Sequence, residues 1–364
     1  MYDLIMPAAG GSTRFAGTRP KWLLTHPLGD LMFYEALRGL DLSKFDRIFI
    51  TCLQQHDEKF HCVQAIRNQT AKRGLADKVR VIVLPEPTRH QPQTVAETIK
   101  RGEITGAFVV KDSDNYFELT PEPTNFISVC DATQLPPENS VNVFNKSFVQ
   151  ENEHGVVVNI AEKQVISKNI CTGAYGFSSA DQFMKYYEPL AAQDNLYLSH
   201  VIYSMILDNH NFFAKECFNY LDWGTLDDWL RYTAEYATIF IDLDGTLVQN
   251  SAEHFDPIWG TTAGIRENID AVNALYHSNK VRIVITTTRS EAFREQTVGQ
   301  LEREGIKYHD LMLGLSHGKR VIVNDFAPTN PYRSCDAINI PRNSPTLATL
   351  IRGTFGRTLH LPTR

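Results

Sequence analysis

Short apolar runs and segments with helical spacing alternate along the first two-thirds of the chain. The apolar runs predict strands at residues 4–6, 47–52, 79–84 and 107–114. The segments between them have the spacing of helices, at residues 33–40, 57–72 and 94–100. Strands that alternate with helices form mainly parallel sheets, so the pattern predicts an α/β fold.

A second α/β pattern begins at TIFIDLDG, residues 238–245. It continues with a helix near 265–275, a strand at 281–286, a helix at 291–304 and a strand at 319–325. A chain of 364 residues is longer than one hydrophobic core usually accommodates, so the length suits two domains. We therefore expect two Rossmann-like α/β domains, at residues 1–236 and 237–364.

The net charge and the cysteine pattern restrict which binding partners and which cellular compartment the sequence favours. A net charge of −6 argues against nucleic acid or an anionic membrane as the main partner. The six cysteines are scattered without a CxxC pair, which suits reduced thiols in a cytosol. No stretch approaches the roughly 18 apolar residues that span a bilayer. These features favour a cytoplasmic protein.

The first candidate site is the loop after the first strand, in IMPAAGGSTRF (5–15) followed by PKWLL. Its small residues let backbone N–H groups approach a polyphosphate. Arg14 and Lys21 can then neutralise phosphate charge. A tight strand-to-helix turn without a ligand would have the same composition, so this loop alone does not decide the function.

Acidic residues accompany this loop. The strand at 107–114 ends in Asp112 and Asp114, where carboxylates can hold Mg²⁺ at the carboxyl edge of a parallel sheet. Asp222 precedes a Gly-Thr turn in YLDWGTLDDW. Taken singly, each acid is better described as a helix cap or a solvated surface charge than as a metal ligand.

Taken in order, the motifs of residues 1–235 resemble the sugar-phosphate nucleotidyltransferases, whose fold is related to that of GT-A glycosyltransferases. The further matching segments are QTVAETI, KDSDNYF, the EK of 162–163, NICTGAYGF, NLYLSHVI and DWGTLDDW. The resemblance implies that a sugar or polyol phosphate attacks the α-phosphorus of an NTP and releases pyrophosphate. The compact domain, without an appended β-helix, favours CTP, with other NTPs left open.

The resemblance also implies roles for individual residues. Arg14 and Lys21 would contact phosphates, and Asp114 and Asp222 would bind Mg²⁺. The positions at the nucleotide are Ala9, Gly10, Gly11, Ser12, Gln93, Thr94 and Asp112, and those at the acceptor are Glu162, Lys163 and Asn169. Ser12 replaces a glycine that is usual in the family, and its Cβ narrows the loop. A first domain that binds nucleotide or substrate without catalysis is therefore the alternative.

The second candidate site is FIDLDGTLV, residues 240–248, in which two acids end an apolar run. A carboxylate such as Asp242 can attack phosphorus and form an aspartyl-phosphate. A second acid nearby, Asp244, can protonate the leaving oxygen and later activate water. A strand-ending turn that merely contains two acids is the structural alternative.

From Thr238 onward the chain resembles the haloacid dehalogenase (HAD) superfamily of phosphohydrolases. The resemblance implies that Thr287, with Thr286 as a rival, binds the phosphoryl group and that Lys319 steadies the intermediate. A solvated lysine at a strand edge is the simpler interpretation of Lys319. Mg²⁺ would be held by Asp242, the carbonyl of Asp244 and Asp325.

The segment between Val248 and Val281 is too short for a large cap over this second site. We expect the first domain or a second subunit to cover part of it, which makes self-association a further expectation. The two domains together predict a bifunctional enzyme with Mg²⁺ in both sites, serving nucleotide-sugar or capsule precursor synthesis. A metabolite-sensing scaffold is the non-enzymatic rival, although grouping unpaired acids without metal or chemistry is costly.

Overall fold

The computed structural model describes residues 2–10, 19–136, 142–251, 258–325 and 335–355. The chain divides into two compact units, Met1–Trp229 and Leu230–Arg364. The division falls inside helix α7 (Leu226–Thr233), shortly before the boundary expected near Tyr236. No helix among the described residues is long and apolar enough to cross a membrane.

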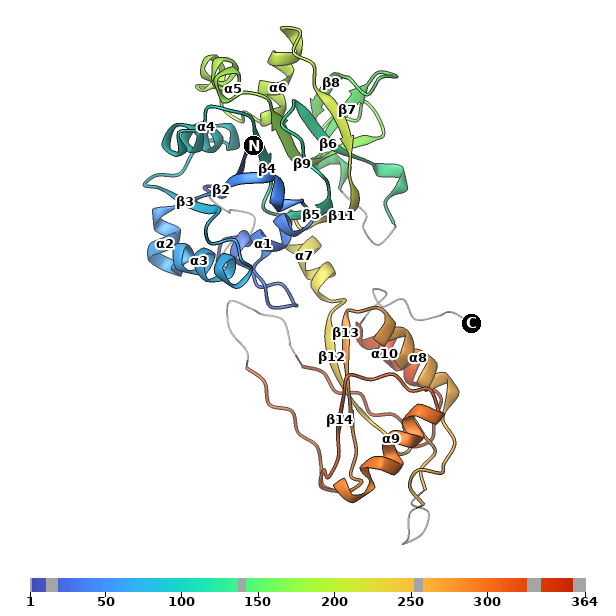
Figure 1. Ribbon diagram of the computed structural model, residues 1–364. Coiled ribbons are helices and arrows are strands. Elements are labelled where there is room, and N and C mark those ends of the chain that lie inside the picture. The colour runs from blue at the N-terminus through green and yellow to red at the C-terminus, as the bar shows by residue number, and fades with distance from the viewer. Residues whose placement is uncertain (1, 11–18, 137–141, 252–257, 326–334, 356–364) are drawn as a thin grey trace. The chain divides into compact units, whose positions relative to one another are not determined.

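The first unit is built on a mixed sheet that has nine strands within the described residues (Figure 1). The main path has the order β10-β6-β9-β4-β1-β2-β3, and β7 and β8 extend it beside β9. The strands are β1 (Tyr2–Pro7), β2 (Phe45–Leu53), β3 (Val79–Leu84), β4 (Phe108–Lys111), β6 (Phe126–Asp131), β7 (Ser147–Glu151), β8 (Val157–Glu162), β9 (Asn169–Phe177) and β10 (Phe213–Glu216). A separate antiparallel pair joins β5 (Asn115–Glu118) to β11 (Phe218–Asp222).

The strand order creates a switch point beside β1. This strand lies between β2 and β4 and is parallel to both. The chain moves from β1 to β2 and β3 on one side and returns with β4 on the other. In open α/β sheets, ligands bind in the crevice beyond the carboxyl ends of strands at such a point.

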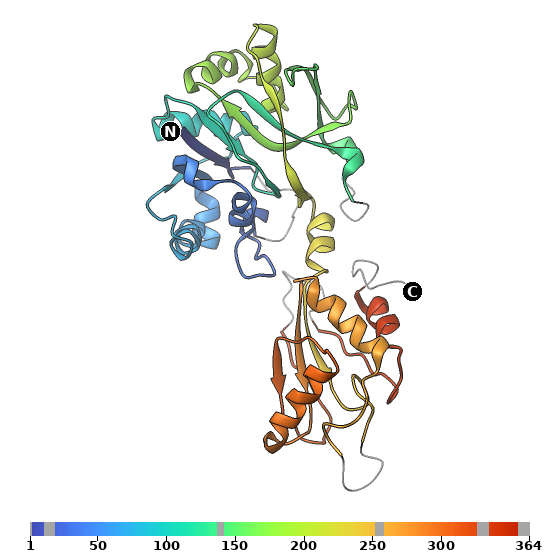
Figure 2. The same cartoon turned by 45° about the vertical axis from the view of Figure 1, so that its right-hand side comes forward.

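Helices cover both faces of this sheet, as Figures 1 and 2 show. They are α1 (Met32–Arg38), α2 (Gln54–Phe60), α3 (Cys62–Lys72), α4 (Gln91–Gly102), α5 (Ala180–Tyr187) and α6 (Leu198–Leu207). Phe33 and Ile66, from α1 and α3, join one core cluster, whereas Val95, Phe183 and Ile202, from α4, α5 and α6, join the other. Burial on both sides explains why the parallel strands read as continuous apolar runs.

The single helix expected at 57–72 is wrong, because α2 and α3 are separate. His61 between them adopts the left-handed conformation, with φ 51°. Its N–H donates to Asp57 O at 2.8 Å, and the Asp57 side chain accepts from Val63 N at 2.9 Å. A left-handed residue ends a helix, and glycine usually marks it. Because no glycine marks this position, the sequence pattern predicted one continuous helix.

The second unit has a parallel sheet whose described strands are β12 (Ala237–Asp242), β13 (Val281–Thr286) and β14 (Asp310–Met312). Its helices are α8 (Arg266–His277), α9 (Arg294–Arg303) and α10 (Leu347–Phe355). Val272 of α8, Leu301 of α9 and Ile351 of α10 share one core with Ile283 and Ile285 of β13. The helices therefore bury the apolar side of the sheet.

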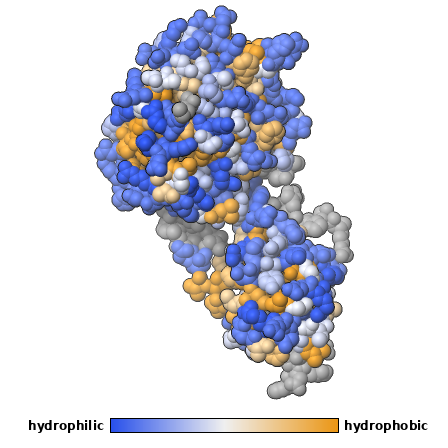
Figure 3. Space-filling model, in the orientation of Figure 1, coloured by the Kyte–Doolittle hydropathy of each residue, from blue (hydrophilic) through white to orange (hydrophobic). Residues whose placement is uncertain are grey.

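The strand expected at 319–325 is not formed. Val321, Ile322 and Val323 are 72%, 56% and 90% exposed, and residues 320–325 have no strand assignment. With Phe240 and Met312 they are among the exposed apolar residues of this unit, on whose surface Figure 3 shows hydrophobic patches. An apolar, β-branched run favours a strand, but a strand also needs a hydrogen-bonded neighbour.

Candidate active sites

The loop after β1 begins at the switch point of the first unit. Ala8 and Ala9 are buried, and Ala8 N donates to Thr51 O at the end of β2 at 2.8 Å. Gly10 is exposed, and a Cβ built there would meet nothing within 4 Å. The backbone is thus open to a ligand at Gly10. The expected phosphate-binding residues Gly11, Ser12 and Arg14 lie outside the described residues.

Lys21 and Asp114 are brought together, although 93 positions separate them in the chain. Lys21 opens a short 3₁₀ helix, Lys21–Leu23, whose Trp22 and Leu23 are buried and anchor its backbone. The Lys21 ammonium forms an ion pair with the Asp114 carboxylate. Burial alone would raise the pKa of Asp114, but the charge and hydrogen bond of Lys21 hold that pKa at about 2.

The Asp112 carboxylate is closely surrounded by groups from α4 and β9. The Gln91 side chain, at the start of α4, donates to this carboxylate. Burial, followed by the charge of Asp114, raises the pKa of Asp112 to about 6. Gly173 on β9 has φ +95°, and a Cβ there would lie 2.5 Å from Asp112 Oδ2. Glycine is therefore required beside this carboxylate.

Asp222 reaches the same region through the β5–β11 pair. It lies directly opposite Asn115, the residue that follows Asp114. A Cβ built on Gly224 would lie 3.1 Å from Asp222 Oδ1 and 3.7 Å from Asp114 Oδ2. The two acids expected at the metal therefore face the same point, and a glycine leaves that point open.

Lys146 completes this group of charges and was missed from sequence. Its Nζ lies 2.7 Å from Asp222 Oδ2 and donates to the Tyr220 hydroxyl at 2.9 Å. In the sequence it is a lone lysine in FNKSF, without a motif or a charge pattern around it. Its role depends on a contact between distant segments, which no local signal could have predicted.

These side chains line a cavity of about 180 Å³. Its charged and amide lining includes Gln91, Asp112, Asp114, Lys146, Glu162, Lys163 and Asp222. Glu162 accepts hydrogen bonds from Ser147 Oγ at 2.6 Å and from Ser199 Oγ. The exposed Lys163 donates from Nζ to the Tyr197 hydroxyl at 3.1 Å. The cavity therefore joins the residues expected at the metal to two of those expected at the acceptor.

Six of the residues expected at the first site that the structure describes do not line this cavity: Ala9, Gly10, Lys21, Gln93, Thr94 and Asn169. The Asn169 amide donates to Glu151 at 2.9 Å, away from the acid group. Gln93 accepts from the backbone of Arg89 at 2.7 Å, and the buried Thr94 hydroxyl pairs with Thr88 at 2.7 Å. In this segment Gln91, two residues before Gln93, is the amide that reaches the cavity.

The donor set of the first unit fits Mg²⁺. Within the part of the chain that the structure describes, no three acid, histidine or cysteine side chains form a metal-binding group. Two carboxylates, Asp114 and Asp222, do face one point. Mg²⁺ in nucleotide sites is held by one or two carboxylates together with substrate phosphates and water, so this pair suffices.

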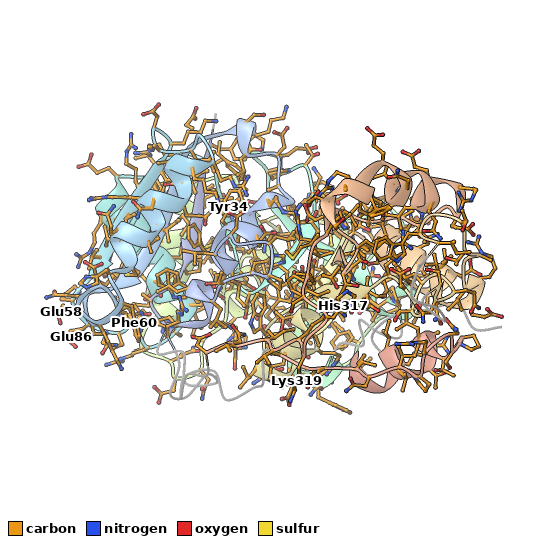
Figure 4. All side chains as sticks on the ribbon, turned by 90° about the horizontal axis from the view of Figure 1, so that it is seen from below. Tyr34, Glu58, Phe60, Glu86, His317 and Lys319 are labelled. Atoms are coloured by element: carbon orange, nitrogen blue, oxygen red, sulfur yellow. The ribbon has the colours of Figure 1, made fainter. Side chains whose placement is uncertain are left out.

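In the second unit, Asp242 ends β12 opposite Thr286 of β13. Arg320 Nη2 lies 2.9 Å from Asp242 Oδ1. Burial raises the pKa of Asp242, and the charge of Arg320 acts against that rise. Lys319, labelled in Figure 4, is exposed on the segment after β14. The cation on Asp242 is therefore the guanidinium of Arg320, one residue beyond the predicted lysine.

Asp244 is held by residues from the segment after β13. Arg289 donates to its two carboxylate oxygens, from Nε at 2.9 Å and from Nη2 at 2.7 Å. The Thr287 hydroxyl donates to Asp244 Oδ2 at 3.2 Å, whereas that of Thr286 donates to the Ile241 carbonyl at 3.2 Å. Of the two threonines, Thr287 is the one directed at the acids.

The ligands expected at a second metal are two carboxylates, Asp242 and Asp325, and the Asp244 carbonyl. Asp325 is exposed on the segment that forms no strand, and the described residues contain no metal-binding group of three such side chains. The Asp242 carboxylate, the first of the expected ligands, is already paired with Arg320. This arrangement does not fit the expected metal, so we derive no step through one in this unit.

The first unit thus has a nucleotidyltransferase-like Rossmann-type fold, which covers about 63% of the chain. It is similar to a nucleoside-diphosphate-sugar pyrophosphorylase from Vibrio cholerae RC9, with a TM-score of 0.51 and 20% identity over 63% of this chain and 98% of that one. It is also similar to the inositol-1-phosphate CTP transferase from T. maritima, with a TM-score of 0.51 and 14% identity over 63% and 91% of the two chains. The sequence matches no protein-family model, and no curated protein is significantly similar to it.

Proposed function

We propose that the first unit transfers a nucleotidyl group from an NTP to a sugar or polyol phosphate and releases pyrophosphate. The observation that carries the proposal is the pair of carboxylates, Asp114 and Asp222, that face one open point beside Lys21. The fold likeness to a nucleotide-sugar pyrophosphorylase and an inositol-phosphate CTP transferase supports it. CTP is the favoured nucleotide.

In this reaction the residues bind and neutralise phosphates rather than form covalent bonds. Mg²⁺ bound by Asp114 and Asp222 would neutralise phosphate charge. Lys21 follows the loop after β1, so it can bind the nucleotide phosphates that this loop would hold. Gln91 fixes the Asp112 carboxylate, and Glu162 is held by Ser147 and Ser199 toward the acceptor side. Held in line, the acceptor oxygen attacks without a large loss of entropy.

We further propose that the second unit is a phosphatase of the HAD type. Asp242 would attack the phosphorus, and Asp244 would protonate the leaving oxygen. The support is that Asp244 lies two residues from Asp242 and that the Thr287 hydroxyl is directed at it. To carry a proton, Asp244 must first leave its two-point pair with Arg289. The alternative, favoured if the loop with Ser12 is inactive, is a phosphatase whose first unit only binds nucleotide or substrate.

Together the units would carry out two steps in making an activated sugar or polyol for surface-glycan assembly. The test uses the full chain with Mg²⁺, a panel of NTPs and a panel of sugar and polyol phosphates, and follows pyrophosphate and orthophosphate separately. Asp114→Asn should abolish pyrophosphate release alone, and Asp242→Asn orthophosphate release alone. Asp77→Asn, at an exposed loop position, is the control. Pyrophosphate release that persists in D114N would refute the transferase assignment.

A further inference from the structure

The cavity of the first unit contains an ammonium group that no motif predicts. The Lys146 side chain is 17% exposed and lies directly before β7. Its Nζ contacts Asp222 Oδ2 at 2.7 Å and the Tyr220 hydroxyl at 2.9 Å. Burying most of an ammonium is costly unless partners hold it. Lys146 is therefore part of a built site and not a solvated surface lysine.

Each of the two acids expected at the metal is paired with a lysine. Lys21 holds Asp114, and Lys146 holds Asp222. A divalent cation at the point near Gly224 would meet Asp114 Oδ2, which Lys21 holds, and Asp222 Oδ1, on the same carboxylate that Lys146 holds through Oδ2. Its charge would repel both ammonium groups. A substrate phosphate is then an anion that either lysine can bind, beside the carboxylates of Asp112, Glu162 and Asp228 that also line the cavity.

The two lysines come from different segments, and Lys146 lines the cavity whereas Lys21 does not. Lys21 follows the loop after β1, so it belongs with the nucleotide phosphates. The Lys146 carbonyl accepts from Lys163 N at 2.9 Å, at the open end of the β7–β8 hairpin. Glu162 ends the second strand of that hairpin and lines the same cavity. Lys146 therefore lies with the residues expected at the acceptor.

We propose that Lys146, together with Lys163, binds the phosphate of the acceptor, a phosphomonoester dianion. In the free protein the Lys146 ammonium is paired with the Asp222 carboxylate. When the metal–nucleotide complex binds, the metal would replace the ammonium at that carboxylate. This proposal rests on the nucleotidyltransferase function proposed above. During transfer a P–O bond forms between the acceptor phosphate and the α-phosphorus. The bond to the bridging oxygen breaks, and its electron pair leaves with pyrophosphate. Lys146 reduces the repulsion between the two anionic phosphates.

The kinetic test compares Lys146→Gln, Lys146→Arg and the exposed control Lys168→Gln. K146Q should raise the KM for the acceptor by about 10- to 100-fold, as the loss of a charged hydrogen bond does, and change the KM for the NTP by less than about twofold. K146R should recover much of the loss because it keeps the charge, and K168Q should match the unsubstituted chain. An equal rise in both KM values would contradict the division between the two lysines.

A second measurement distinguishes exchange at Asp222 from a structural role. Mn²⁺ is titrated into the full chain without substrates and followed by electron paramagnetic resonance. K146Q should bind Mn²⁺ several-fold more tightly, because Asp222 loses a competing cation, and Asp222→Asn should bind it more weakly. A structural lysine would not produce opposite changes in Mn²⁺ affinity and acceptor KM.

Folding is checked by circular dichroism before either measurement. If K146Q is misfolded, Lys146→Met replaces it, since the stem can stay beside the Tyr220 ring, whose centroid is 5.6 Å from Nζ. Unchanged Mn²⁺ affinity and unchanged acceptor KM in a folded variant overturn the proposal. If the unsubstituted chain releases no pyrophosphate with any acceptor, the proposed function and the acceptor role both fail. The Mn²⁺ titration still decides whether Lys146 and the metal compete for Asp222.

Discussion

Arg289 and Asp244 form a two-point ion pair inside the second unit. The guanidinium has no exposed surface and donates to both carboxylate oxygens, at 2.9 and 2.7 Å. Its third nitrogen donates to the Thr297 hydroxyl of α9 at 3.2 Å. The pair therefore links the segment after β12 to that after β13 and fixes the direction of a carboxylate that sequence alone places beside Asp242.

Arg289→Met should destabilise the second unit by about 3 kcal/mol, because it leaves a mostly buried carboxylate without its partner. The free energy of unfolding is measured in urea by circular dichroism. Adding Asp244→Asn should restore part of the loss. Arg282→Met, which breaks the exposed pair with Asp310, should cost less than about 1 kcal/mol. An R289M chain with unchanged stability would contradict the packing described.

Thr287→Ala and Thr286→Ala form a matched pair. If the Thr287 hydroxyl binds the phosphoryl group, T287A should lower orthophosphate release by about 100-fold, which is typical of a lost transition-state donor. T286A removes a hydroxyl bonded to the Ile241 carbonyl and should have a much smaller effect on turnover. Orthophosphate release with the natural phosphomonoester is the measurement, and the reverse order would reassign the threonine.

Gly173→Ala should damage the first site through Asp112. The added Cβ would lie 2.5 Å from Asp112 Oδ2 and 2.7 Å from Asn115 Nδ2, at φ +95°. We expect a loss of about 2 kcal/mol in unfolding free energy and slower pyrophosphate release. Gly106→Ala is the control, since a Cβ there meets nothing within 4 Å. Equal stability of the two variants would argue against the close approach.

Acid should destabilise the first unit through His26, whose ring lies 6.2 Å from those of Trp223 and Trp229. Burial, with the charge of Arg38, lowers its pKa from 6.5 to about 4. Because the unfolded chain binds this proton more tightly, the stability is complete above pH 6.5 and is lost as the pH falls toward 4.

Between about pH 7 and pH 4.5, His26 should account for a loss of about 2 kcal/mol in unfolding free energy. The loss should be absent in His26→Asn and retained in a variant of the exposed His154. Tryptophan fluorescence during urea unfolding is the readout, since Trp22, Trp223 and Trp229 all belong to this unit. Equal pH dependence in H26N and the unsubstituted chain would exclude His26 as the cause.

Val323→Asp tests the missing strand. At 90% exposure, Val323 should accept a charge with a change of less than about 0.5 kcal/mol in unfolding free energy. Val284→Asp, on the buried strand β13, should cost about 3 kcal/mol. If V323D is as damaging as V284D, the segment packs as the strand that the sequence pattern predicts.

Sequence patterns predicted β3 and β13 to the residue, because both are apolar runs bounded by polar turns. The resemblance to the sugar-phosphate nucleotidyltransferases implied that Lys21, Asp114 and Asp222 act together, and the β5–β11 pair brings Asp222 beside Asp114. Neither the patterns nor the resemblance predicted Lys146, Gln91 or Arg320, whose contacts join segments distant in the chain. Propensity misled most at His61, where a helix ends without a glycine, and at Val321–Val323, where an apolar run forms no strand.

The β5–β11 pair has one further consequence. Asp222 meets Asn115 across an antiparallel ladder whose side chains alternate between faces. Shifting that ladder by a single position would turn Asp222 to the opposite side while leaving every functional group in the chain. The register of β11 therefore matters to the proposed transferase as much as the presence of Asp222. An insertion between Leu221 and Asp222, beyond the existing irregularity between Phe218 and Leu221, should impair pyrophosphate release as much as removing the acid.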